Sequence, residues 1–133
     1  MFQEKKFYTK DHEWLHFNGN QAYLGVSKFK LTGIRKIEHI ELFGFRNGDV
    51  IEQGMLMLRL NYTDYVISLH APIKCILLET NCIISEGNWD QIIALPEEEG
   101  WLFKIEHIGT DQNHLIIECE YQERFLSSHL TNP

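Results

Sequence analysis

Short apolar or alternating runs, separated by frequent turn signals, occupy most of this chain. The turn signals are clusters such as Asn18-Gly19-Asn20, Asn47-Gly48-Asp49 and Gly87-Asn88. This pattern is typical of a mainly-β (α+β) domain built as a sandwich or barrel. It predicts strands over Gln21–Val26, Ile37–Leu42, Met55–Leu60, Tyr65–Leu69, Cys75–Glu79 and Trp101–Glu106.

Three segments have helical rather than strand character. A helix is predicted over Lys28–Arg35 with Ser27 as its N-cap, and one or two turns over Trp89–Ala94. A final helix is predicted over Glu118–Leu130, although Leu115–Tyr121 also alternates like a strand, so this boundary stays open. The residues on one side of that helix are Tyr121, Phe125, Leu126, His129 and Leu130.

Length and composition argue against several classes of function. The 133 residues, 44% hydrophobic and 23% charged, predict a single globular domain over residues 1–133. A net charge of -7 argues against nucleic acid or an anionic membrane as partner. No apolar run approaches the ~20 residues that cross a bilayer, and the start of the chain lacks an apolar signal segment. The three cysteines, Cys75, Cys82 and Cys119, have no metal-type spacing and fit a reducing compartment, so we expect the cytoplasm.

One short motif has a catalytic interpretation. The run HEWLH, from His12 to His16, matches the H-E-x-x-H pattern of zinc hydrolases. On a helix its histidines would share one Zn²⁺ and the intervening glutamate would act as a general base. The pattern is loose enough to arise by chance, and a strand with Trp14 packed inward is the favoured interpretation. No metal site is therefore expected.

Several blocks in order resemble the H protein of the glycine cleavage system. They read FYTKDHEWL, YLGVSKF, IEHIEL, GDVIEQG, LHAPIKCILLETN and GWLFKI, and they span Phe7 to about Ile105. The first and last blocks are specific to that family, whereas GDVIEQG suits any lipoyl or biotinyl domain. The resemblance implies a flattened hybrid barrel-sandwich of two antiparallel sheets, with short helices and a C-terminal helix.

The resemblance also implies a function. Proteins of that family are carriers and not enzymes. Their lipoyl arm takes an aminomethyl group from a pyridoxal-phosphate glycine decarboxylase, presents it to a folate-dependent aminomethyltransferase, and is reoxidised by a flavin dehydrogenase. The arm is attached to a lysine at the tip of a hairpin.

The chain departs from the family at this hairpin. Counting back from Leu69-His70-Ala71-Pro72, the family's attachment segment falls on five residues: Asn61, Tyr62, Thr63, Asp64 and Tyr65. The attachment lysine is replaced by Asp64, and the glutamate that helps ligases recognise the site by Asn61. A lipoyl amide needs a primary amine on a long stem, which aspartate lacks. No lipoyl cofactor is expected.

We therefore predict a degenerate family member that acts as a non-catalytic interaction or regulatory module. Its expected partners are proteins, such as glycine decarboxylase-like or lipoate-handling enzymes. Tyr62 and Tyr65 either form a contact patch or pack across the hairpin. Two alternatives stay open: a working carrier modified at another lysine such as Lys74, and a zinc hydrolase using His12 and His16.

Overall fold

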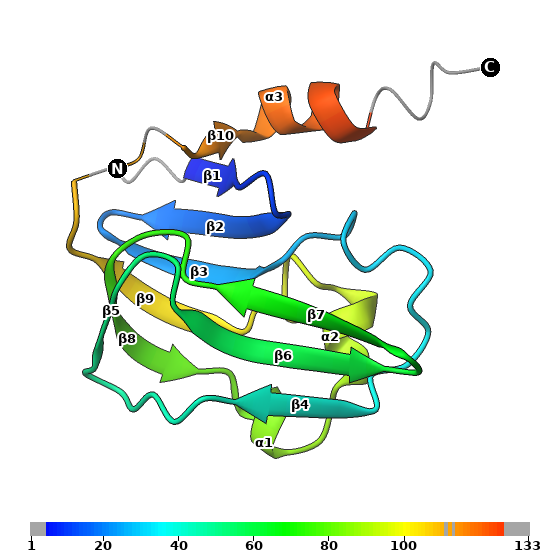
Figure 1. The fold of residues 1–133 in the computed structure, drawn as a ribbon. Helices are drawn as coiled ribbons and strands as arrows, with labels where there is room; N and C mark the ends of the chain where they lie inside the picture. The colour runs from blue at the N-terminus through cyan, green and yellow to red at the C-terminus, as the bar shows by residue number, and fades with distance from the viewer. Residues whose placement is uncertain (1–4, 111, 113, 127–133) are drawn as a thin grey trace.

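A computed structural model describes residues 5–110, 112 and 114–126 of the chain. Two antiparallel sheets are packed against each other, with short helices at their margins (Figure 1). The larger sheet has the order β10-β1-β2-β3-β9-β8-β5 and the smaller has the order β4-β6-β7. The prediction of a mainly-β fold with two antiparallel sheets is confirmed.

The predicted strands are present, with ends displaced by no more than a few residues, and further short strands occur between them. The larger sheet contains β1 (Lys5–Tyr8), β2 (Glu13–Asn18), β3 (Gln21–Val26), β5 (Val50–Ile51), β8 (Cys75–Thr80), β9 (Phe103–His107) and β10 (Ile116–Ile117). The smaller contains β4 (His39–Leu42), β6 (Leu56–Tyr62) and β7 (Tyr65–His70). The strand interpretation of the HEWLH segment is right, since it lies mostly in β2 with Trp14 buried.

The helices are shorter than expected. They are α1 (Cys82–Ser85), α2 (Asp90–Ala94) and α3 (Glu118–Tyr121), the last continuing as the π-helix η1 (Gln122–Leu126). The helix α1 was not predicted. The final segment contains both a strand and a helix, the two forms that its sequence predicted. Its strand β10 pairs with β1, and α3 begins directly after it. The side chain of Leu126 and all of His129 and Leu130 lie outside the described residues.

The helix predicted over Lys28–Arg35 is wrong. This segment forms successive turns, in which N–H groups donate to carbonyls three residues earlier, as from Lys30 to Ser27 at 3.1 Å. The predicted cap does exist, since the Ser27 hydroxyl accepts the Lys30 N–H at 3.3 Å. Gly33 then turns the chain with φ +87°, and the three-residue spacing buries Leu31 and Ile34 together. Burial of this pair against the sheets outweighs the weak local helix preference.

The main core lies between the two sheets. Its fully buried members come from both layers and include Leu24, Ile51, Leu58, Leu69 and Leu77. Each such side chain removed from water contributes about 1.5–3 kcal/mol before entropy is counted. This core constrains the register of β7, because the buried Ile67 and Leu69 alternate with more exposed residues and a one-residue slip would expose them.

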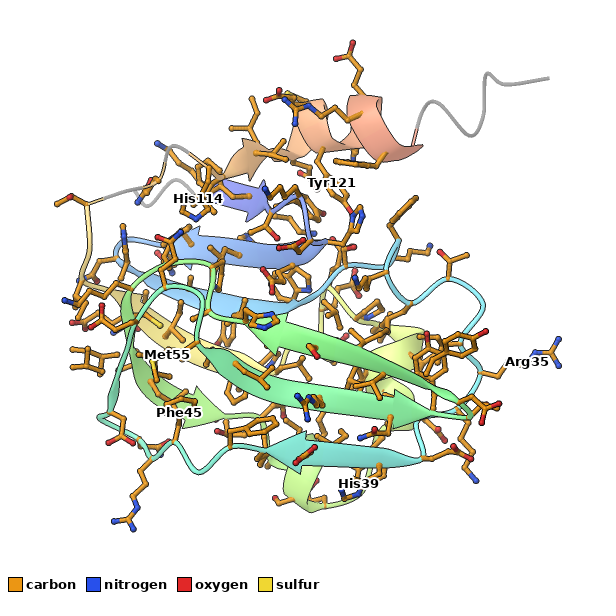
Figure 2. The ribbon with its side chains drawn as sticks, in the orientation of Figure 1. Arg35, His39, Phe45, Met55, His114 and Tyr121 are labelled. Carbon is orange, nitrogen blue, oxygen red and sulfur yellow. The ribbon has the colours of Figure 1, made fainter. Side chains whose placement is uncertain are left out.

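A second, aromatic cluster lies under the C-terminal helix. Tyr8, Trp14, Ile116 and Tyr121 are buried together there, and the rings of Tyr8 and Tyr121 stack with centroids 3.9 Å apart. Figure 2 shows Tyr121 projecting from α3 toward the sheet. The cluster attaches the C-terminal segment to the larger sheet. Among the described residues, no helix is long and apolar enough to span a membrane.

Candidate functional site

The five residues that the resemblance predicts to match the family's attachment segment lie in the hairpin formed by β6 and β7. The strands join through a two-residue turn, Thr63–Asp64, flanked by the opposed pair Tyr62 and Tyr65. Thr63 has φ +48°, a left-handed conformation that a short hairpin turn requires. Asp64 is exposed at the tip, where the sequence count placed it.

Glu38, which lies just before β4, holds this turn in place through both its side chain and its backbone. The Glu38 carboxylate accepts the N–H of Thr63 at 2.6 Å, and the Glu38 N–H donates to the Asn61 carbonyl at 2.8 Å. His39 then faces Asn61 in the β4–β6 ladder. A hydrogen bond to a carboxylate is stronger than a neutral one. The tip is therefore an ordered surface.

The two tyrosines beside the turn pack on each other. Their ring centroids are 5.8 Å apart with an interplanar angle of 27°. Tyr62 also packs against the main core, whereas Tyr65 exposes 66% of its surface and the next residue, Val66, exposes 53%. The structure thus supports cross-hairpin packing for the pair. The role of Tyr65 as a contact residue stays a prediction.

Two cationic residues lie near the tip. A shallow depression of about 220 Å³ beside the turn is lined by Gly33, Ile34, Arg35, Lys36, Glu38, Tyr62 and Thr63. Arg35 extends away from the ribbon into solvent on this side of the molecule (Figure 2). No sequence motif connects Arg35 or Lys36 with the hairpin, because nearly 30 residues separate them in the chain. Only the fold brings them together.

The residues at the tip do not fit a lipoyl group. Attachment requires a primary amine displayed by the turn, and neither Thr63 nor Asp64 has one. Lys74, the nearest lysine that follows in sequence, lies beyond the opposite end of β7, between Pro72 and β8. Its Nζ is 3.6 Å from a carboxylate oxygen of Glu52. Lys74 therefore is not presented at this hairpin.

The zinc-hydrolase interpretation is not supported. Its motif needs a helix, but His12 lies in a turn with φ +66° and His16 lies in β2. The Nδ1 of His12 is 2.7 Å from the Tyr121 hydroxyl, so this ring is part of the aromatic cluster. Within the described ranges, no group of three or more histidine, cysteine, aspartate or glutamate side chains is arranged to hold a metal ion.

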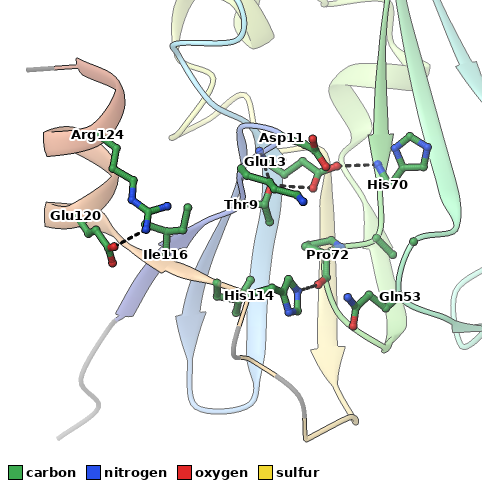
Figure 3. A pocket seen from close by; sticks show the side chains of 14 residues that line it. Thr9, Asp11, Glu13, Gln53, His70, Pro72, His114, Ile116, Glu120 and Arg124 are labelled. Carbon is green, nitrogen blue, oxygen red and sulfur yellow. Dashed lines mark hydrogen bonds and ion pairs between the residues drawn. The ribbon is translucent and has the colours of Figure 1, made fainter. Parts of the chain in front are cut away.

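The glutamate of the same motif lines a separate pocket at the far end of β7 (Figure 3). Glu13 is 3% exposed; its carboxylate accepts the Thr9 hydroxyl at 3.0 Å and the His70 N–H at 2.8 Å. Burial raises the pKa of Glu13 to about 7. In the same pocket, the His114 ring is hydrogen-bonded to the Pro72 carbonyl. Sequence reasoning found no role for this glutamate beyond the zinc motif.

The three cysteines, all among the described residues, are not joined in disulfide bonds. All three are free thiols; Cys75 is buried, whereas Cys82 and Cys119 are exposed. Burial raises the pKa of Cys75 to about 12, which keeps its thiol protonated at neutral pH.

Comparison with known proteins agrees with the fold. The family model described as glycine cleavage H-protein matches residues 6–129. A glycine cleavage system H protein from Thermosynechococcus vestitus is 30% identical over 91% of this chain and 92% of its own length. A probable H protein from Korarchaeum cryptofilum is 26% identical over 93% and 96%. The crystal structure of an H protein from Mycobacterium marinum matches with TM-score 0.74 at 20% identity, covering 90% of this chain and 94% of that one.

Proposed function

Because this chain belongs to the glycine cleavage H-protein family, we propose that it is a member without a lipoyl group and acts as a protein-interaction or regulatory module. The observation that carries the proposal is Asp64 at the tip of the β6–β7 hairpin. In this role the protein is not an enzyme and holds no cofactor. The cytoplasm stays its expected compartment.

The chemistry of the turn supports the loss of lipoylation. A ligase forms an amide between the lipoyl carboxyl group and a lysine amine, and a carboxylate cannot replace that nucleophile. Asn61, where the family has a recognition glutamate, is neutral, and its carbonyl is occupied by the Glu38 N–H. Both the nucleophile and its acidic neighbour are therefore missing from an otherwise intact hairpin.

The surface that remains supports an interaction role. Tyr65 and Val66 expose 66% and 53% of their surface beside the ordered turn, and Arg35 and Lys36 lie close by. Tyrosine and arginine are enriched where binding energy concentrates in protein interfaces. The proposed partners are the enzymes that handle family carriers, glycine decarboxylase-like and lipoate-handling proteins.

Intact mass spectrometry tests the loss of lipoylation. The protein is co-expressed with a lipoate ligase and lipoate, and a lysine-bearing H protein in the same cells serves as the positive control. We expect the control to gain a lipoyl group and this chain to keep its unmodified mass. A lipoyl adduct that peptide mapping places on Lys74, or on any other lysine, would instead establish the working-carrier alternative.

A binding measurement tests the interaction role. Purified glycine decarboxylase and lipoate ligase from the same organism are titrated against the protein and against Tyr65→Ser. Loss of an exposed aromatic anchor should weaken the binding of its partner about tenfold. Tyr23→Ser is the matched control, since Tyr23 is 39% exposed on the other sheet. Equal affinities for the two variants would place the contact away from the hairpin.

A further inference from the structure

The segment 28–36, which lies between β3 and β4, concentrates positive charge in an acidic protein. Its nine residues include four of the chain's 12 lysines and arginines and no aspartate or glutamate. Because the net charge of the whole chain is -7, the remaining residues carry a charge of -11. The four cations are Lys28, Lys30, Arg35 and Lys36, and we call this stretch the basic segment. Its charge is opposite to that of the molecule around it.

The cations of the basic segment are not neutralised by neighbouring carboxylates. None of the four side chains makes an ion pair with another residue that the structure describes. Four cations elsewhere do lie within 3.8 Å of a glutamate oxygen, namely Lys6, Arg59, Lys74 and Arg124. Glu38 borders the same surface, but its carboxylate accepts the Thr63 N–H at 2.6 Å. The charge of the basic segment is therefore available to a group outside the chain.

Packing holds the basic segment in place with its charges outward. Leu31 and Ile34 are 5% and 8% exposed and belong to the main core. Successive turns connect them, since the Leu31 N–H donates to the Lys28 carbonyl at 3.2 Å and the Ile34 N–H to that of Leu31 at 3.0 Å. Lys28, Arg35 and Lys36 are exposed. A surface that is already ordered loses less conformational entropy when a partner binds.

The basic segment borders the exposed aromatic residue of the hairpin. The depression of about 220 Å³ is lined by Arg35 and Lys36 from the segment and by Tyr62 and Thr63 from the hairpin. The ring of Tyr62 stacks on Tyr65, which is 66% exposed. Cations that attract a partner thus lie beside an aromatic side chain of the type that anchors protein interfaces.

We propose that the basic segment and Tyr65 form one docking surface for an acidic segment of a partner protein. Carboxylates of the partner pair with Arg35 and Lys36, and an apolar side chain of the partner packs on Tyr65. Lys28 and Lys30 extend the attraction along the segment. This inference rests on the proposed function and names the chemistry of the partner that binds there.

The charge of the rest of the molecule favours a protein as this partner. A nucleic-acid duplex or an anionic bilayer presents negative charge over an area larger than the basic segment, so the -11 charge of the other residues repels it. An acidic patch of the segment's own size meets mainly the cations. Asp64 adds one exposed negative charge next to Tyr65, which directs carboxylates of the partner toward Arg35 and Lys36.

Fluorescence polarisation with a labelled copolymer of glutamate and tyrosine tests the inference without the natural partner. We expect binding at about 50 mM salt that weakens about tenfold at about 300 mM, because salt screens exposed charges. Arg35→Glu should weaken binding about fivefold or more, whereas Arg35→Lys should bind as the parent protein does. Arg46→Glu is the matched control and should also leave binding unchanged. Arg46 is exposed, and Figure 2 shows its neighbour Phe45 on the opposite side of the molecule from Arg35.

Two results with the copolymer overturn the inference: no binding at low salt, and binding that Arg35→Glu leaves unchanged. Duplex DNA or phosphatidylserine vesicles serve as competing probes. If either binds more tightly than the copolymer and loses affinity with Arg35→Glu, the surface serves a different class of partner and the inference is also overturned.

Titrating glycine decarboxylase and lipoate ligase against the same variants separates this inference from the proposed function. An enzyme that binds the parent protein and Arg35→Glu equally well overturns only the inference. A copolymer that binds through Arg35, while neither enzyme binds, overturns only the proposed partners.

Discussion

The Glu13 carboxylate accepts the backbone N–H of His70 at 2.8 Å, although the two residues are 57 positions apart in the chain. This contact joins the start of β2 in the larger sheet to the end of β7 in the smaller one. It also closes the edge of β7 where the hairpin meets the rest of the fold. Because this carboxylate is buried, we expect the stability of the protein to depend on pH.

The first prediction follows from the Glu13 pKa, which burial raises from 4.5 to about 7. A raised pKa means that the folded state holds the proton more tightly than the unfolded state. The contribution of Glu13 to stability is therefore largest below pH 4.5 and is lost as the pH rises to about 7, by about 3 kcal/mol at about 1.4 kcal/mol per pH unit.

Glu13→Gln isolates this effect, because glutamine does not titrate. Denaturant unfolding of both proteins between pH 4 and pH 8 gives the difference in free energy of unfolding. The free energy of unfolding of the parent protein should fall relative to that of Glu13→Gln as the pH rises from 4.5 to about 7. A difference that stays constant with pH would contradict the assignment to Glu13.

The second prediction concerns Gly100. A Cβ at this position would lie 2.6 Å from the Leu95 carbonyl oxygen and 2.7 Å from that of Gln91, both backbone atoms that cannot easily move. Gly100→Ala should lower the free energy of unfolding by about 2 kcal/mol or more. Gly109→Ala is the control, since its Cβ would approach the Lys74 side chain no closer than 3.3 Å. Equal stabilities of the two variants in urea unfolding would refute this argument.

The third prediction concerns the Tyr121 hydroxyl. It lies 2.7 Å from His12 Nδ1 and 2.9 Å from Ser27 Oγ, and it links α3 to the turns on either side of β2 and β3. Tyr121→Phe keeps the ring stack on Tyr8 but leaves buried Ser27 without this partner. Stability should fall by about 1–3 kcal/mol, with faster hydrogen exchange in β10 and α3. Tyr23→Phe, at a partly exposed ring, should change neither quantity.

The fourth prediction tests the proposal that the hairpin lacks only the side chains needed for lipoyl attachment. Asp64→Lys combined with Asn61→Glu returns the amine and its acidic neighbour to an ordered two-residue turn. The double variant should become a substrate of lipoate ligase, detected by intact mass. The Asp64 substitution should cost about 0.5 kcal/mol or less because that residue is exposed, whereas Asn61 is half-buried. Asp64→Asn with Asn61→Glu is the amine-free control.

A folded double variant that stays unmodified would show that more than the two side chains has changed. Tyr62 and Tyr65, stacked beside the turn, are then the groups that hinder the ligase. Lipoylation of the amine-free control would show instead that a lysine outside the turn is the substrate.

The sequence determined the elements whose pattern is local. Short apolar runs predicted the strands β6 and β7, and counting residues predicted that Asp64 lies at the tip between them. The position of Asp64, a residue without an amine, at the tip of the hairpin could be predicted by counting residues. The inward position of Trp14 could also be predicted, because a large apolar side chain in a strand is expected to lie on the buried face of its sheet.

Only the tertiary structure decided the contacts between distant segments. The Lys28–Arg35 segment folds into turns because Leu31 and Ile34 are buried against the sheets, a gain that local propensity does not contain. The hydrogen bond from the Thr63 N–H to Glu38 and the burial of Glu13 against His70 both depend on which strands become neighbours. Such neighbours are set by the packing of the whole core, since each strand pattern alone fits several pairings.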